Sequence, residues 1–246
     1  MTDPPKPEQA ASAERRSNLL AAIEQRLREV FEKTLHDRIA QHEVDTTTLV
    51  RFMESLDAES DRALVIIFFS YIDTLLTSCF TRELSPHIPP RTLLENFGPL
   101  ASANARIKMA CALSWISPDV YADLERLRKL RNHVAHSPFE ANFSSARVAS
   151  IVKSLSRRES VFDGSERLKT EEHITVKDLF RVRAMLTCYA MLLQLLTAPT
   201  ALKMGMSPHT VWQLENWPDN LSALNRAMAN WFSKHADVLW HPESPG

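Results

Sequence analysis

The chain has 246 residues, of which 44% are hydrophobic and 24% charged, a composition typical of a protein that buries a real core. Its 29 Lys and Arg residues against 30 Asp and Glu residues give a formal net charge of −1. This balance excludes a protein coated in basic surface, so any anionic partner must bind a local patch. Only four glycines are present to supply the positive φ angles of hairpins and tight turns, which predicts an all-α fold.

The three cysteines, Cys79, Cys111 and Cys188, are isolated in apolar surroundings without a CxxC pair. This spacing is typical of reduced thiols in a cytosolic protein and indicates neither a disulfide framework nor a zinc site. The N-terminus lacks an apolar signal segment, and the chain has no run of about 18 uninterrupted apolar residues. We therefore expect a cytoplasmic protein that uses no membrane, no metal and no other cofactor.

Residues 1–16 are rich in proline, alanine, serine and charge, and the sequence predicts a disordered tail there. Residues 17–57 are predicted to form an N-terminal helical segment. Its first helix has an apolar face that runs from Leu20 to Leu35. Asp45 or a following threonine is expected to cap its second, shorter helix.

Residues 58–198 are predicted to form the main helical domain. Glu59 or Ser60 opens it with a helix that is apolar nearly all round, which predicts the central buried helix of the fold. Three prolines and an F-G-P-L turn interrupt the chain before the next helix, in the segment ANARIKMACALSWI. Ser117 and Pro118 then form a strong helix start. Further helices are expected near residues 144–154 and over residues 176–196.

Residues 199–246, which begin at Pro199, are predicted to form a Trp-rich helical extension of one or two helices. Its tryptophans could stack on nucleic-acid bases, but their spacing is more typical of core and interface residues. These tryptophans are Trp212, Trp217, Trp231 and Trp240.

The helix from Pro118 to about His136 has an apolar stripe with Arg131 near its centre. A buried arginine needs a partner, and Asp73 lies in the middle of an apolar stripe on the predicted central helix. One interpretation is therefore a structural ion pair between Arg131 and Asp73 that holds two core helices in register. The stripe around Arg131 consists of Val120, Leu124, Leu127, Leu130 and Val134.

The segment LERLRKLRNHVAH resembles the signature of the HEPN superfamily, small helical-bundle proteins with an R-x4-6-H motif. Arg131 and His136 match that motif, and Asn132 is the polar residue that typically follows the arginine. The segments SDRALVIIFFSYIDTLL, FGPLASANARIKMACALSWIS and DLERLRKLRNHVAHS, in this order, are similar to the mannitol operon repressor branch. The resemblance covers about residues 58–155 and implies a HEPN-type helical bundle with an N-terminal helix and a C-terminal extension.

The resemblance implies metal-independent cleavage of RNA in the active members, with two motifs that meet across a dimer interface. An imidazole is the side chain best suited to proton transfer at physiological pH, which favours His136 for the acid or base role, and Arg131 offers a cationic fork to the phosphate. Asn132 is expected to orient His136 or to bind a phosphate oxygen. We therefore predict a homodimer with both Arg131 side chains near its two-fold axis. Further substrate-binding residues are expected to be Arg126, Arg128, Lys129 and His133.

Two other sites are weaker hypotheses. His133 and His136 have a His-x-x-His spacing, but no Cys, Asp or Glu lies nearby at ligand spacing for a metal. Ser137 follows His136 directly, but no elbow motif of a nucleophilic serine precedes it.

The main alternative to an endoribonuclease is a regulator of the mannitol-operon type that acts through protein–protein contacts, with the motif kept for architecture. The sequence contains no helix-turn-helix with base-reading side chains, so sequence-specific DNA binding is the weaker form of this alternative. Under the nuclease hypothesis the partners are RNA and an antitoxin or regulatory protein, in a toxin, defence or regulatory setting.

Overall fold

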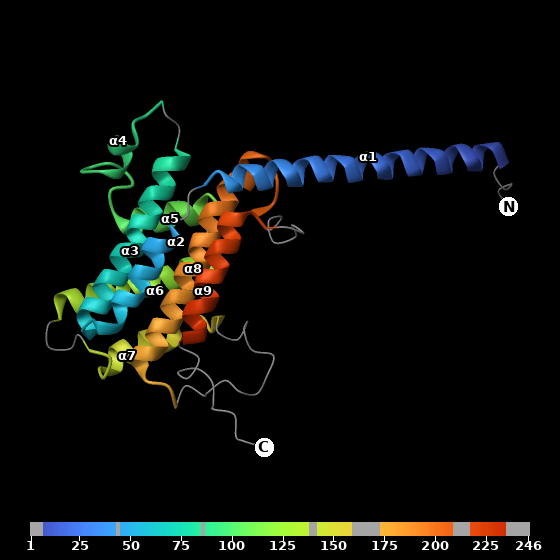
Figure 1. Ribbon diagram of the computed structural model, residues 1–246. Coiled ribbons are helices and arrows are strands. Elements are labelled where there is room, and N and C mark those ends of the chain that lie inside the picture. The colour runs from blue at the N-terminus through green and yellow to red at the C-terminus, as the bar shows by residue number, and fades with distance from the viewer. Residues whose placement is uncertain are drawn as a thin grey trace, which may run out of the picture.

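A computed structural model of the chain describes residues 7–42, 45–84, 87–137, 142–158, 173–208 and 217–234. Within these residues the regular elements are all helices, which confirms the predicted all-α class (Figure 1). In chain order they are α1 (Pro7–Ala40), α2 (Thr46–Ser55), the 3₁₀ helix η1 (Leu56–Ala58), α3 (Asp61–Glu83), α4 (Pro90–Leu94), α5 (Ala103–Ala112), α6 (Pro118–His136), α7 (Ala146–Ser154), α8 (Val176–Lys203) and α9 (Asp219–Lys234).

The long helix α1 begins earlier than the sequence predicts. It starts at Pro7, so residues 7–16 are helical where a disordered tail was expected, and residues 1–6 lie outside the described part of the chain. Alanine, glutamate, glutamine and arginine are strong helix formers, so a segment without an apolar face can still extend a helix that has already been nucleated. The N-terminal part of α1 projects beyond the rest of the molecule (Figure 1).

The C-terminal turns of α1 pack on the body of the protein. Leu35 and Ile39 are fully buried there, whereas Ile23 and Val30, further from the body, are 47% and 51% exposed. At the start of α9, the side-chain amide of Asn220 donates hydrogen bonds of 2.8 Å to two carbonyl oxygens at the end of α1. Because a helix leaves its last carbonyls without internal partners, this contact caps the C-terminal end of α1. It also joins the N-terminal helix α1 to the C-terminal helix α9.

The central helix of the fold is α8 rather than α3. In the most apolar 18-residue window of each helix, 78% of α8 is buried against 44% of α3. The prediction for α3 was wrong because Ser and Thr occupy one of its faces, and their hydroxyls bond to carbonyls of the same helix. Both helices are long and apolar enough to span a membrane by length and composition, a test that the core helices of soluble proteins also pass.

Pro199 lies inside α8, although the sequence predicted that the helix would end before it. A proline lacks the N–H that would bond to the carbonyl four residues earlier, which here belongs to Leu195. Nη2 of Arg82 in α3 donates a 2.8 Å hydrogen bond to that carbonyl oxygen. A guanidinium from a neighbouring helix thus replaces the missing donor, and α8 continues to Lys203.

A single hydrophobic core unites the N-terminal segment, the main domain and the C-terminal extension. α1 and α2 pack against α8 and α9, so residues that are far apart in the sequence share one interior. Trp231 of α9 is buried in that core, as the sequence predicted, and Trp217 is half-buried at its edge. Trp212 and Trp240 lie outside the described residues.

Candidate functional site

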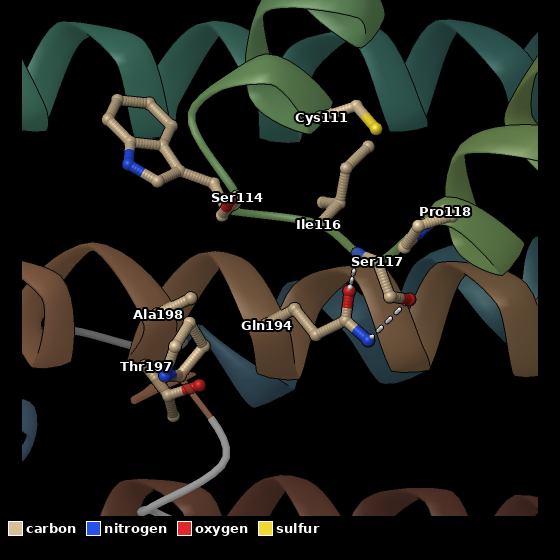
Figure 2. A pocket seen from close by; sticks show the side chains of 10 residues that line it. Cys111, Ser114, Ile116, Ser117, Pro118, Gln194, Thr197 and Ala198 are labelled. Carbon is tan, nitrogen blue, oxygen red and sulfur yellow. Dashed lines mark hydrogen bonds between the residues drawn. The ribbon is translucent and has the colours of Figure 1, made fainter. Parts of the chain in front are cut away.

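The motif lies on α6, whose two ends agree with the prediction. Pro118 occupies the first turn, where a helix has no internal use for the N–H that proline lacks, and the helix ends at His136. Its start is fixed to α8, as Figure 2 shows. The side-chain carbonyl of Gln194 accepts a 2.8 Å hydrogen bond from the Ser117 N–H, and its amide donates a 3.1 Å bond to the Ser117 hydroxyl.

A cavity of about 330 Å³ lies beside this contact, between the start of α6 and α8 (Figure 2). Its lining is mainly apolar, and its polar side chains serve the fold: Gln194 holds Ser117, and the Thr197 hydroxyl donates to a carbonyl of its own helix. The 19 residues of α6 rise about 27 Å along its axis, so the cavity is remote from the last turn of α6. We therefore place the candidate site at the C-terminal end of α6.

Asp73 is paired with Arg106 of α5, so the predicted ion pair between Asp73 and Arg131 is wrong. Nη2 of Arg106 donates to the two carboxylate oxygens of Asp73 at 2.7 and 2.8 Å, and Nε donates at 3.0 Å. The Arg106 side chain is only 7% exposed, and its Nη1 donates to the Leu100 carbonyl at 2.6 Å. α5 packs against α3, so its arginine satisfies the carboxylate without a contribution from α6.

Arg131 is half-buried and forms no ion pair with a carboxylate of the described residues. Its Nη1 donates a 3.2 Å hydrogen bond to the side-chain carbonyl of Asn132. A neutral amide orients a guanidinium but does not cancel its charge. The arginine of the motif therefore retains a positive charge that is available to an anion.

Arg126 and Arg128, two of the predicted substrate-binding residues, are each paired with an acid one turn earlier on α6. Arg126 bonds to Asp123 at 2.8 Å, and Arg128 bonds to Glu125 at 2.9 and 3.0 Å. The hydrogen bond from Arg128 holds the pKa of the Glu125 carboxyl below its usual value. Both arginines are thus largely neutralised, and substrate binding by them stays an untested prediction.

Asp123 fixes the position of α6 against the elements around it. This carboxylate is fully buried, and besides Arg126 it accepts bonds from Nη2 of Arg158 at 3.0 Å and from the N–H of Ser156 at 3.1 Å. The hydroxyl of Thr187 in α8 lies 3.4 Å away. A buried carboxylate with several donors is strongly held, so α6 forms a rigid base for its last turn.

A groove between α6 and α7 brings together three further predicted residues, Lys129, Asn132 and His133. Its volume is about 480 Å³, and none of its described lining residues is acidic. Lys129 and Asn132 lie on its α6 side, and Arg147 enters from α7. The sequence did not predict Arg147 as a site residue, because a single arginine in the first turn of a short helix does not by itself indicate a function. The described lining residues are Lys129, Asn132, His133, Arg147, Ser150 and Ile151.

His136 is exposed at the end of α6, next to a further arginine from α3. Nη2 of Arg62 donates a 3.0 Å hydrogen bond to the Ala135 carbonyl, one of the carbonyls that a helix end leaves without internal partners. Like Arg131, Arg62 has no ion pair with a carboxylate of the described residues, and the same holds for Lys129 and Arg147. We refer to these four cations together with His133 and His136 as the cationic end of α6.

The His-x-x-His spacing does not assemble into a ligand set in the described residues. No group of three or more His, Cys, Asp or Glu side chains that could hold a metal ion occurs in this part of the chain.

Burial raises the pKa of the Cys79 and Cys188 thiols to about 12, which disfavours the thiolate that metals and electrophiles require.

Comparison with protein families gives a match. A family model described as "Mannitol repressor" matches residues 62–192, which is more than half of the chain. The matched region runs from α3 into α8 and contains both the motif and the groove. No curated protein and no solved structure matches the chain.

Proposed function

Because the chain belongs to the mannitol repressor family, we propose that it is a regulatory protein that acts on RNA. In this proposal a homodimer binds single-stranded RNA at the cationic end of α6 and cleaves it without a metal ion. Arg131 and His136 supply the chemistry, in keeping with the resemblance of the motif to that of the HEPN superfamily.

One observation carries the proposal: within the described residues, the cations at this end of α6 have no carboxylate partner, in a chain whose net charge is −1. Nearer the N-terminal end of the same helix, Arg126 and Arg128 have carboxylate partners, whereas Arg131 bonds to the neutral amide of Asn132. If Arg131 served only architecture, a buried counter-charge would be expected. The acid predicted for that role, Asp73, is occupied by Arg106.

The residue types suit cleavage of RNA by its own 2′-hydroxyl. A base removes the 2′-proton, the 2′-oxygen attacks phosphorus, and the bond to the 5′-oxygen breaks as an acid protonates it. The products are a 2′,3′-cyclic phosphate and a 5′-hydroxyl, so no water, metal or redox partner is consumed. His136 from each of two copies can serve as base and acid, while Arg131 stabilises the extra negative charge at phosphorus.

A face of α3 supports the dimer. Ile67, Ser70, Thr74 and Ser78 are exposed on it, and the face carries no charge. The hydroxyls of Ser70 and Thr74 donate to carbonyls of their own helix, so burial against a second copy would leave these donors satisfied. We therefore propose this face as the contact between two copies of the chain.

A second candidate function is regulation through protein–protein contacts without catalysis. The description of the family as a repressor favours it, and so does Phe97, whose side chain is fully exposed. The turn that presents Phe97 is well defined: Asn96 has a positive φ of 53°, and Gly98 packs against the backbone of Leu93 with no room for a side chain. An exposed aromatic side chain on such a turn offers an anchor for a protein partner.

The test is cleavage of an end-labelled single-stranded RNA by the purified full-length protein in the presence of EDTA. We expect cleavage that EDTA does not reduce, products with 2′,3′-cyclic phosphate ends, and activity that co-elutes with a homodimer by light scattering. A purified dimer that cuts no RNA with or without divalent ions would contradict the proposal and favour the protein-contact regulator. Cleavage that requires a metal would contradict the mechanism.

A further inference from the structure

The groove between α6 and α7 has the chemistry of a phosphate site. Its polar lining offers an ammonium from Lys129, a guanidinium from Arg147, an imidazole from His133, an amide from Asn132 and a hydroxyl from Ser150. All of these groups can donate hydrogen bonds, and none carries a negative charge. Ile151 is the apolar member among the described lining residues. A metal cation would meet two fixed positive charges here, whereas a phosphate group would meet charge and donors from both helices.

The two cations stand on different helices. Lys129 belongs to α6 and Arg147 to α7, so an anion between them can be held from two sides. Both side chains are exposed at the groove, and neither forms an ion pair with a carboxylate of the described residues. An anion therefore need not displace a carboxylate of the described part of the chain, and its binding would reduce the mutual repulsion of the cations.

Asn132 connects the groove to the motif. It lines the groove, and its side-chain carbonyl accepts the hydrogen bond from Nη1 of Arg131. A ligand that extends from the groove past Asn132 therefore reaches the Arg131 side chain. A single phosphate ion would fill only one of these positions, whereas a polynucleotide carries phosphates at regular intervals and can occupy both.

We propose that the groove is a subsite for the RNA backbone, in which Lys129 and Arg147 bind a phosphate adjacent to the one held by Arg131. This inference rests on the proposed function and adds α7 to the RNA-binding surface. The subsite positions the strand and takes no part in proton transfer. Arg147 is accordingly a binding residue whose loss affects affinity for RNA.

The test measures binding of a fluorescently labelled single-stranded RNA by anisotropy, with full-length protein that carries His136→Gln to prevent cleavage. In that background we expect Arg147→Ala to weaken binding at least about fivefold and to lower the slope of log K against log salt by about 0.7, the value for one phosphate contact on a single strand. Lys153→Ala is the matched control, because Lys153 is exposed on the same helix but does not line the groove. It should change affinity less than about twofold.

The outcomes separate the subsite from the proposed function. If Arg147→Ala and Lys153→Ala bind RNA equally well while Arg131→Gln weakens binding, the subsite is wrong and the proposed function stands. If the protein neither binds nor cleaves RNA, the proposed function fails, and inorganic phosphate becomes the probe. Thermal stabilisation by phosphate that is lost in Arg147→Ala would then support the groove as a phosphate site, and its absence would overturn it.

Discussion

His136→Gln should reduce cleavage of single-stranded RNA by about a hundredfold or more, the scale of lost general acid–base catalysis. Glutamine retains hydrogen-bonding groups but cannot exchange a proton near neutral pH. His136 is exposed at the end of α6, so the substitution should leave the thermal melting temperature and the dimer unchanged. The measurement is the initial rate of cleavage of an end-labelled RNA at equal dimer concentration.

The matched control for this prediction is His87→Gln, which replaces another exposed histidine, one distant in the sequence from the motif. It should cleave RNA at the wild-type rate. Equal rates for His136→Gln and wild type would mean that the activity has another source, and the nuclease hypothesis would be abandoned in favour of the protein-contact regulator.

Asp73→Ala should lower the free energy of unfolding by about 3 kcal/mol, because it leaves the guanidinium of Arg106 buried without its counter-charge. Arg106 is 7% exposed and Asp73 is 31% exposed, so the stranded charge is the one with less access to water. After the substitution, the Leu100 carbonyl is the only partner left from the contacts described above. The measurement is urea denaturation followed by circular dichroism.

A double variant separates the ion pair from the packing at this site. Asp73→Leu combined with Arg106→Met replaces both charges with apolar side chains and should recover most of the lost stability, since no buried charge is left unpaired. If the double variant is as destabilised as Asp73→Ala, packing rather than charge determines the loss of stability. If Asp73→Ala is as stable as wild type, the ion pair between Asp73 and Arg106 is not buried as described.

Helix starts were predicted well because their signals are local. The side chains of Asp45 and Ser60 accept hydrogen bonds from backbone N–H groups three residues later, as the sequence indicated for α2 and α3. Pro118 marks the first turn of α6, and the sequence placed the end of that helix at His136. These signals involve residues within one turn of each other, so no knowledge of the tertiary structure is needed.

Partners between helices were predicted less well. A helical wheel indicated that Asp73 and Arg131 lie on apolar stripes, but it did not indicate which neighbouring helix each stripe would meet. The same argument applied to α5 would have identified Arg106, which lies beside the buried Ala110. Two arginines were therefore candidates for one carboxylate. Because α5 and α6 both pack against α3, only the positions of the two side chains in the tertiary structure decided between them.

Two further features depend entirely on tertiary contacts. The passage of α8 through Pro199 requires Arg82 from another helix, so the local rule that proline ends a helix failed there. Arg147 becomes part of the candidate site only because α7 packs beside the last turns of α6. The local sequence pattern indicates neither of these two contacts.

If cations without a carboxylate partner in the described residues bind RNA at the end of α6, two arginines of that helix should differ in their effect on binding. In the His136→Gln background, Arg131→Gln should weaken binding of single-stranded RNA at least about tenfold, which corresponds to about 1.4 kcal/mol. Arg128→Gln removes a cation that Glu125 already neutralises and should change affinity less than about twofold. Equal losses for the two variants, or unchanged binding by Arg131→Gln, would contradict the account.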